Sequence, residues 1–519
     1  MKNSNYRNRP FFALGSLKRQ LLSGALALAS IAVISRPLSA AISLREVVNS
    51  AVEHASGVQI EKQRLLEAQG DVLEKRSLFD TGIDLTLGYS SNASANNGSS
   101  LKTLTPSLSS TTLLPFGLSV SPKVSVSGSS SRDFPSNSAT SAGLTLSLPL
   151  MAGLGDNESR MALTASQKQY TAQSFTVQFA LSKVTFSAAE AYWDYVLSYQ
   201  TLKLEHQLTL LAKESLRAVK ALAGAGEVAR VSVDQAEAYL QQAEAEEVAA
   251  VQSLQERWST LLLAMGSAVD GREKPEEPCD FFPLPDEGVA ALSNVRVMQA
   301  QALASRADLQ AFRQECNAAS DRLLGSNNSM KPKIDLDLWV GYDGSHGGSG
   351  VNDYLASLSS NIPGANVSLT LRYTFNAGGS RAQGAYVRSR AGYETALISR
   401  QELEKTIESN VADAVNSVKN NAAIWQLRMK SASTYRLLNA SELKKYRMGM
   451  SDLYKLQSVS TYLANAERQL LMAEKSYASS LLTLRYQTAT LIQKQNDLFS
   501  INDRDLLSVP VITNASDKS

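Results

Sequence analysis

Apolar and polar residues alternate strictly at 83–89 and again at 143–149. Because successive side chains of a β-strand point to opposite faces, each of these segments places its apolar side chains on one face. This pattern is typical of a barrel wall between lipid and water, and also of a half-buried strand in a soluble sandwich. The alternation therefore predicts strands and leaves both settings open.

Two stretches without proline follow the strands, 150–274 and 364–509. Both are rich in Ala, Leu, Glu, Gln and Lys, which lose little side-chain entropy in a helix. In the second stretch, large side chains recur every seven residues, at Leu456, Leu463, Leu470, Tyr477, Leu484 and Leu491. Smaller side chains follow three places on, which predicts long helices packed side by side in an elongated assembly.

The chain contains an internal duplication. The segment 144–153 matches 369–378 in five of ten residues, and the segment that begins at Ile83 is echoed at Ile334. The long helical stretches align at an offset of 223 residues. Each half is therefore predicted to run helix, strand pair, long helix, tight turn and long helix.

Charge is distributed unevenly along the 519 residues. Charged residues make up 19% of the chain but number four in 85–155, and the formal net charge is +2. A chain this close to neutral, without a local basic patch, is not expected to bind nucleic acid. The low charge of the strand region favours a membrane wall.

The N-terminus is predicted to be an export signal. Basic residues precede an uncharged, mostly apolar run at 21–34 and a small-residue cleavage site at 38–40. The apolar run is too short to span a bilayer, and no later segment approaches the ~20 residues that a membrane helix needs. Export without helical spans leaves secretion, the periplasm or an outer membrane crossed by β-strands.

These patterns divide the chain into five predicted parts. They are a signal peptide (1–41), a first repeat (42–270, strands about 83–150, helical hairpin about 156–268), a linker (271–300), a second repeat (301–502, strands about 334–376, helical hairpin about 380–495) and a C-terminal tail (503–519). The linker is assigned from four prolines that crowd 275–285.

Together, the export signal, the duplicated plan and three short segments resemble the TolC-like outer-membrane efflux proteins. The segments 149–160 and 375–381 are similar to that family's strand-to-helix junctions, and Tyr446-Arg-Met-Gly449 is similar to its periplasmic hairpin. The resemblance covers about 42–502. It rests on the order and duplication of the segments and not on one motif.

The resemblance implies an α+β membrane protein in the outer membrane of a Gram-negative bacterium. It implies a homotrimer in which four strands per subunit complete one twelve-stranded barrel, continued by a long periplasmic α-helical barrel. A periplasmic adaptor, an inner-membrane transporter or ATPase, and outer-membrane lipid are the implied partners. Trimer formation also follows from physics, because open strand edges in lipid cost several kcal/mol for each unpaired backbone group.

One region departs from the family plan. The segments 103–114 and 117–127 form an additional alternating pair around Leu114-Pro-Phe-Gly117. This pair is either an extra hairpin outside the barrel or a replacement for one of the assigned strands. The strand ends also carry aromatic residues that are expected to anchor at the membrane interfaces, namely Tyr89, Trp339, Tyr342 and Tyr373.

The resemblance places a periplasmic gate at the two hairpin turns. Gly226 and Gly449 are expected in positive-φ turns, which are also the expected adaptor contacts. The gate candidates are polar or charged residues around these turns: Arg230, Ser232, Asp234, Tyr446, Arg447, Asp452, Tyr454 and Lys455. Many relatives carry acidic residues at this entrance, whereas the matched positions here are Ser232, Lys455 and Ser458. The alternative is that these side chains simply cover a solvated helix tip.

Little in the sequence points to catalysis. Cys279 and Cys316 flank the linker in an oxidising compartment, which permits a disulfide worth about 4 kcal/mol at most. Two separate thiols are the alternative. The three histidines are widely spaced, and no nucleophile elbow, zincin helix or phosphate-binding lysine motif occurs. No enzyme activity, metal site or cofactor is therefore predicted.

The pattern predicts the outer-membrane channel of a tripartite efflux or type I secretion system. A surface-exposed coiled-coil structural or adhesive protein is the first alternative. It explains the seven-residue repeat but not the strand pair that returns in each half. An exported enzyme is the second alternative, and it would need a catalytic constellation that the sequence lacks.

Overall fold

The computed structural model describes residues 41–93, 100–130, 136–267, 274–285, 288–292, 294–359, 366–375, 378–495, 498–500 and 508–510. The predicted export signal, apart from its last residue, lies outside the described residues, as does the predicted tail apart from 508–510. Residues from Ile42 onward belong to one compact unit.

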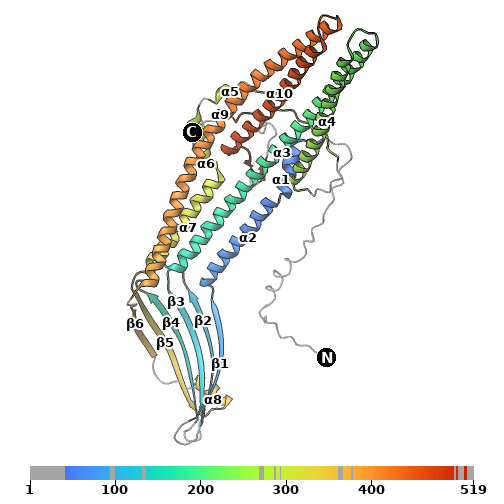
Figure 1. The fold of residues 1–519 in the computed structure, drawn as a ribbon. Coiled ribbons are helices and arrows are strands. Elements are labelled where there is room, and N and C mark those ends of the chain that lie inside the picture. The colour runs from blue at the N-terminus through green and yellow to red at the C-terminus, as the bar shows by residue number, and fades with distance from the viewer. Residues whose placement is uncertain are drawn as a thin grey trace, which may run out of the picture. The chain divides into compact units, whose positions relative to one another are not determined.

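Two long helical hairpins account for most of this unit. Helix α3 (Glu158–Gly224) has 67 residues and turns into α4 (Arg230–Ala264) with 35. Helix α9 (Ser380–Arg447) has 68 residues and turns into α10 (Leu453–Gln487), also with 35. At 1.5 Å per residue, α3 and α9 are each about 100 Å long. Both turns lie at the end of the unit opposite the sheet (Figure 1).

The seven-residue repeat of the second stretch forms the buried face of α10. Leu456, Leu470, Tyr477 and Leu484 are buried, and Leu463 is half-buried. Large side chains at this spacing fall on one stripe of a helix, where they pack against a neighbouring helix. The predicted hairpin end near 495 is too late, because α10 ends at Gln487 and a short strand, β7 (Gln493–Gln495), pairs with β8 (Leu498–Ser500).

Shorter helices support the sheet-side halves of α3 and α9. Helix α2 (Ser56–Arg76) packs against α3, and α7 (Ala307–Ser329) packs against both α3 and α9 (Figure 1). Helices α5 (Gly288–Ala291) and α6 (Val295–Ser305) contact α9. The segment predicted as a linker, 271–300, therefore contains α5 and the start of α6. Among the helices of the described residues, none is long and apolar enough to cross a membrane.

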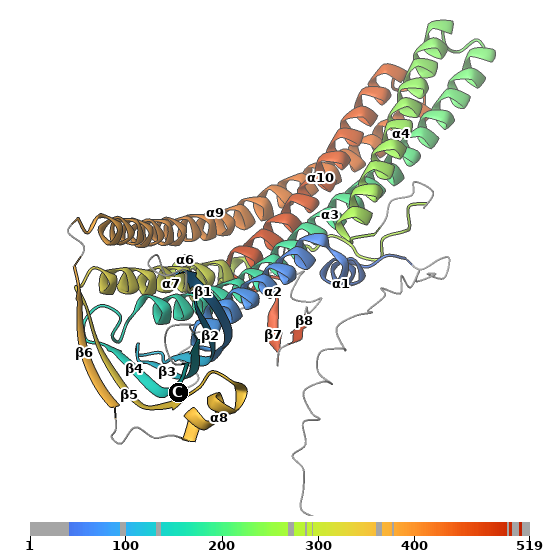
Figure 2. The same cartoon turned by 90° about the horizontal axis from the view of Figure 1, so that it is seen from below.

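All six long strands belong to one antiparallel sheet in the order of the sequence. The strands are β1 (Gly82–Ala93), β2 (Ser100–Leu113), β3 (Ser119–Ser130), β4 (Asn137–Pro149), β5 (Lys333–Gly347) and β6 (Asn366–Thr374). The sheet is curved, and β1 and β6 are its two edges (Figure 2). The expectation of four strands per subunit is therefore wrong. The additional alternating pair forms β2 and β3, which enter the sheet between β1 and β4 and replace neither.

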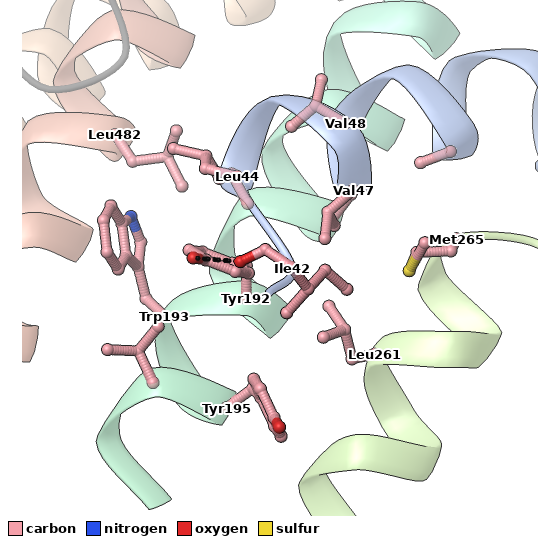
Figure 3. Close-up of a cluster of buried hydrophobic side chains, with 14 of the residues drawn as sticks. Ile42, Leu44, Val47, Val48, Tyr192, Trp193, Tyr195, Leu261, Met265 and Leu482 are labelled. Atoms are coloured by element: carbon pink, nitrogen blue, oxygen red, sulfur yellow. Dashed lines mark hydrogen bonds between the residues drawn. The ribbon is translucent and has the colours of Figure 1, made fainter. Parts of the chain in front are cut away.

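A buried belt halfway along α3 joins the two repeats. Tyr192, Trp193 and Tyr195 of α3 pack with α1 (Leu44–His54) and with the end of α4, and Leu482 comes from α10 (Figure 3). The hydroxyl of Tyr192 donates to the carbonyl of Ile42 at 3.2 Å and to Asp280 Oδ2 at 2.9 Å. Burial and the neighbouring Asp280 raise the pKa of Tyr192. The belt therefore fixes the start of the described chain and the segment between the repeats against the same helix.

Candidate functional site

One face of the six-stranded sheet is apolar along its whole width. The strand register places Leu85 opposite Leu108, Leu108 opposite Val124, and Val124 opposite Ala142. Ala142 then lies opposite Tyr342. Directly opposed residues of neighbouring strands share a face. The same face carries Ile83, Leu87, Leu144, Leu146, Leu336, Leu338, Val340, Val367, Leu369 and Leu371.

The opposite face of the sheet is polar. Seven of the eight Asp, Glu, Lys and Arg residues in the six strands lie on it: Asp84, Lys123, Lys333, Asp335, Asp337, Asp343 and Arg372. Arg372 Nη2 lies 3.5 Å from Asp337 Oδ2, and Ser147 donates to the same carboxylate. The eighth charge, Lys102, is on the apolar face near the strand ends farthest from the helices. Such segregation suits a wall with lipid on one side and water on the other.

Helix α8 (Val351–Ser359) covers the part of the apolar face where polar and small residues replace aliphatic ones. Thr140 and Ser357 hydroxyls lie 2.6 Å apart, and Ser138 donates to the carbonyl of Gly348 at 2.7 Å. Ser138, Thr140 and Ser357 are buried as a result. At Gly128, a Cβ atom would clash with the ring of Tyr354, so glycine allows the helix to approach.

The aromatic residues expected at the membrane interfaces divide between the two faces. Tyr89, Tyr342 and Tyr373 lie on the apolar face. The expectation for Trp339 is wrong, because its register with Thr145 and Ser368 places it on the polar face. Its indole lies over two glycines, Gly143 and Gly341, where any Cβ atom would be within 2.8 Å of the ring.

Each lateral edge of the unit joins an unpaired strand to an exposed helix. On one side β1 follows α2, whose Ile60, Leu66 and Leu73 are each more than half exposed. On the other side β6 leads into α9, whose Val387 and Ile398 are 57% and 64% exposed. Both edges of the unit therefore expose apolar side chains next to an unpaired strand.

The two hairpin turns are built alike. Gly226 and Gly449 have φ angles of 81° and 71°. Glu227 N donates to the carbonyl of Leu222 at 3.0 Å, and Met450 N donates to that of Lys445 at 2.9 Å. This bond pattern, with glycine in the left-handed region, is the Schellman motif that ends many helices. The prediction of positive-φ glycines at both turns is confirmed.

Tyr446 connects the two hairpins near their turns. Its ring packs in a small cluster with Val219 of α3, Ala236 of α4 and Leu453 of α10. Its hydroxyl is buried and has no hydrogen-bond partner among the described residues. The same residue lines a cavity of about 160 Å³ between the hairpins, together with Tyr239 and other residues of all four helices. Tyr446 is therefore held by packing and not by a polar link.

The other gate candidates lie on the surface of the isolated subunit. Ser232 is half-buried, and Asp452 accepts a bond from Lys455 N at 2.7 Å, which caps α10. The exposed candidates are Arg230, Asp234, Arg447, Asp452, Tyr454 and Lys455. Within one subunit, Tyr446 alone of these residues packs in the apolar cluster, and Arg447 lines the same cavity between the hairpins as Tyr446.

A buried carboxylate near the second turn was not predicted. Glu442 of α9 is 2% exposed, accepts a hydrogen bond from the Ser451 hydroxyl, and lies 3.4 Å from Lys445 Nζ. The bond from Ser451, followed by Lys445, lowers the pKa of Glu442. At the offset of 223 residues, the first hairpin has Val219 and Val228 in these two places. Comparing the two turns in the sequence could have revealed this polar substitution.

Charged residues connect the two repeats along α3 and α10. Arg468 Nε and Nη2 donate to the two oxygens of Glu205 at 2.6 and 2.8 Å, and the Glu205 side chain is 5% exposed. Lys475 Nζ lies 2.9 Å from Glu190 and 3.0 Å from Asp194. We call the Arg468–Glu205 pair and the group of Lys475 with Glu190 and Asp194 the seam pairs.

Cys279 and Cys316 are not bridged in the structure. Cys279 is exposed and pairs through its backbone with Ile42, whereas Cys316 is buried in α7 and donates to the carbonyl of Ala396 at 3.3 Å. The two residues pack against different elements, which explains the absence of the bridge. Among the described residues, no group of His, Cys, Asp and Glu side chains is arranged to hold a metal ion.

The fold is similar to that of solved outer-membrane channels. The CmeC outer-membrane channel of Campylobacter jejuni is 14% identical, with a TM-score of 0.64 over 86% of this chain and 85% of that chain. The outer-membrane protein VceC of Vibrio cholerae is 17% identical, with a TM-score of 0.64 over 86% and 95%. The open-state MtrE channel of Neisseria gonorrhoeae is 14% identical, with a TM-score of 0.61 over 86% and 88%.

No family model and no curated protein matches the chain in sequence. At these identities the structural likeness establishes the fold. The TolC-like fold predicted from the duplicated plan is confirmed in its coarse form, a helix-rich chain with a six-stranded antiparallel sheet.

Proposed function

We propose that this protein is an outer-membrane channel that conducts exported substrates through a tripartite efflux or type I secretion system. The observation that carries the proposal is the sheet, which is apolar on one face, polar on the other, and unpaired at both edges. Such a sheet is stable in lipid only if copies of it close on one another. A conduit performs no chemical step, so no catalytic residue or cofactor is needed.

The proposed assembly is a homotrimer in the outer membrane of a Gram-negative bacterium. The two lateral edges differ, since one consists of β1 and α2 and the other of β6 and α9. Contacts between unlike edges are head to tail, and such contacts form a ring when the rotation closes. Three copies are proposed from the likeness to the TolC-like fold, with the helices forming a tunnel across the periplasm.

The proposed gate is the ring of hairpin turns at the end farthest from the sheet. Tyr446 packs between the hairpins, and the turns at Gly226 and Gly449 are open to solvent. Arg230, Ser232, Asp234, Arg447, Asp452, Tyr454 and Lys455 would face neighbouring copies or water there. A periplasmic adaptor, joined to an inner-membrane transporter or ATPase, would open the ring by binding its open form more tightly.

Membrane fractionation and planar bilayers test the channel itself. The full-length protein should be recovered from the outer membrane as a trimer after crosslinking, and the purified trimer should insert into bilayers as discrete conducting steps. Recovery as a periplasmic monomer, or trimers that never conduct, would overturn the proposal. The coiled-coil adhesin, the alternative function, predicts surface exposure of the helices without conductance.

Tyr446 variants test the gate. Tyr446→Ala removes the ring from the cluster between the hairpins and should increase single-channel conductance severalfold. Tyr446→Phe is the matched control, because it keeps the ring and removes only the hydroxyl without a partner in the subunit. Equal conductance for Tyr446→Ala and the unchanged protein would exclude Tyr446 from the gate. An effect of Tyr446→Phe as large as that of Tyr446→Ala would point to a hydroxyl contact between subunits.

Substitution of a turn glycine tests adaptor docking. Gly449→Val strains a residue at positive φ and should reduce capture of the adaptor in a pull-down with membranes of the same bacterium. Gly392→Val, inside α9 and far from the turn, is the control with the same side chain. Unchanged adaptor capture by Gly449→Val would remove this turn from the docking site.

A further inference from the structure

We infer that the hairpin of β2 and β3 enlarges the membrane barrel to eighteen strands, so that the barrel matches the helical tunnel in circumference. The inference rests on the proposed trimer, since three six-stranded sheets make eighteen strands. The resemblance to the TolC-like proteins implies twelve. The barrel of this protein would then be about half again as wide, because diameter grows roughly linearly with strand number.

Strand pairing shows that the hairpin is part of the wall. β2 pairs with β1 from Thr111 opposite Gly82 to Ser100 opposite Ala93, which is the whole length of β1. β3 pairs with β4 from Ser119 opposite Ser147 to Ser129 opposite Asn137. A hairpin attached outside the wall would instead leave β1 paired with β4. Here β1 and β4 have no shared register, because two strands separate them.

The side chains of the hairpin continue the two faces of its neighbours. Leu104, Leu108, Val120 and Val124 lie on the apolar face, and Lys123 lies on the polar face. Had the hairpin folded against the inside of a barrel, its apolar side would meet the polar face that carries Asp84 and Asp337. The alternation therefore suits one position, between lipid and the water-filled lumen.

The turn between β2 and β3 is seated where the sheet meets the helices. Leu114 N donates to the carbonyl of Leu118 at 2.8 Å, and Gly155 N donates to that of Phe116 at 3.1 Å. Asn157, the residue that caps α3, donates to the carbonyl of Pro115 at 3.0 Å. The turn that joins β2 and β3 is thus held by hydrogen bonds from the start of α3, and the two added strands are not connected to an additional helix.

The widths of the two walls favour six strands. Strands about 4.8 Å apart and tilted about 40° occupy roughly 38 Å of circumference for six strands, and roughly 25 Å for four. Four helices with axes about 8–10 Å apart occupy roughly 32–40 Å. Apart from α8, the four helices that precede or follow the sheet strands in the chain are α2, α3, α7 and α9. Six strands therefore occupy about the same circumference as four helices. Four strands would occupy less, so the wall would have to narrow from the helices to the sheet.

Strand direction allows the ring to close. Six alternating strands leave β1 and β6 antiparallel, so β6 of one copy can pair with β1 of the next without breaking the alternation. Inserting a two-stranded hairpin preserves this parity, whereas a single strand would not. The enlarged barrel would admit bulkier cargo at its outer end, and the narrowest point of the duct would lie at the hairpin turns.

Cysteine pairs in assembled trimers test the strand order. In a background of Cys279→Ser and Cys316→Ala, L85C/L108C and V124C/A142C should each form a disulfide in the membrane, because these residues lie directly opposite. The pair L85C/A142C should not crosslink. Crosslinking of L85C to A142C in trimers would place β1 beside β4 and overturn the inference while leaving the trimeric channel intact.

A deletion tests the width. Removing 100–130, so that residue 99 is joined to 131, leaves β1 followed by β4 as antiparallel neighbours. Electron-microscopic end views of trimers in lipid nanodiscs should show the full-length barrel about 1.5-fold wider than that of the deletion variant. The largest polymer that can enter the channel from the outer side should also be about 1.5-fold larger in diameter for the full-length protein than for the deletion variant. Trimers of twelve-strand width in the full-length protein would overturn the inference. Absence of trimers would instead refute the proposed function, and the cysteine pairs decide the strand order if the deletion variant does not fold.

Discussion

The two repeats agree in their long helices and differ at both ends of them. Helices α3 and α9 have 67 and 68 residues, and α4 and α10 have 35 each. At the sheet end the first repeat supplies four strands and the second supplies two. At the other end, Val219 and Val228 of the first hairpin occupy the places of Glu442 and Ser451 in the second.

This difference reflects what each region packs against. The two repeats contact each other in the buried belt around Trp193 and through the two seam pairs. A change in the length of one long helix would therefore shift its contacts with the other repeat. The sheet can gain a hairpin at little cost, because alternation and strand direction are both preserved. Near the turns, a buried apolar side chain, Val219, occupies the place of a buried, hydrogen-bonded carboxylate, Glu442. Divergence is thus concentrated in the six-stranded sheet and at the proposed gate.

The largest effect is expected in the shared belt. Phe282 is 6% exposed and its ring lies 5.5 Å from that of Trp193, whereas its neighbour Phe281 is 83% exposed. Phe282→Ala should lower the free energy of unfolding by about 3–5 kcal/mol through lost burial and a residual cavity. Phe281→Ala should change it by less than about 0.5 kcal/mol. Urea denaturation in detergent, followed by helical circular dichroism, measures both, and equal losses would show that the belt does not hold the repeats together.

A smaller effect is expected in the six-stranded sheet, the proposed membrane wall. Leu369 and Thr370 are neighbours on β6 that lie on opposite faces. In the proposed barrel, Leu369→Lys would place a charge in lipid and should destabilise the inserted state by about 2–4 kcal/mol near the midplane. Thr370→Lys adds the same charge to the polar face. The yield of trimers in the outer membrane should fall for Leu369→Lys alone, and comparable yields for both variants would contradict the assignment of the faces.

Sequence patterns predicted the structure well where a feature depends on residues close together in the sequence. The seven-residue repeat predicted the buried face of α10, and the matched glycines predicted both turns. Alternation predicted that β2 and β3 are strands but not which strands they pair with, because pairing depends on residues far apart in the sequence. The expectation for Trp339 is wrong because an aromatic side chain does not determine the face of a strand. Asp337 and Asp335, two and four residues earlier, lie on the same face as Trp339 and mark it as polar. Glu442 resembles a surface residue in the sequence, because its partner Ser451 lies beyond the turn.

The third effect concerns the seam pairs, which hold one repeat against the other. Arg468→Met would leave the Glu205 carboxylate buried without its two charged hydrogen bonds and should cost about 1.5–3 kcal/mol. Adding Glu205→Leu should recover most of this loss, because no unpaired charge remains. Lys213, paired with Glu244 inside the first hairpin, is the control, since both side chains are nearly half exposed and Lys213→Met should cost less than about 1 kcal/mol. A double-mutant cycle without coupling between Glu205 and Arg468 would reject the pair as a link between the repeats.

The smallest effect is expected at the second hairpin turn, where a titratable contact replaces two valines. The bond from Ser451 and the charge of Lys445 lower the pKa of Glu442, so the folded turn favours the ionised carboxylate. A depressed pKa in the folded state contributes stability above the ordinary carboxyl value of about 4.3. That contribution is lost as pH falls through the lower, folded value. Acid should therefore loosen the turn at Gly449 and leave the turn at Gly226, which has Val219 and Val228 there, unchanged.

Hydrogen exchange of the backbone amides in the two turns, corrected for intrinsic rates, can resolve this asymmetry. Protection around Gly449 should fall as pH drops below about 4.3, and protection around Gly226 should change less over that range. Glu442→Gln can still accept a bond from Ser451 but cannot titrate, so acid should reduce the protection around Gly449 less in this variant than in the unchanged protein. If both turns lost protection together, or if Glu442→Gln kept the full pH dependence, the loosening would come from another group. The two hairpin turns would then not differ in acid sensitivity as the presence of Glu442 in one and Val219 in the other predicts.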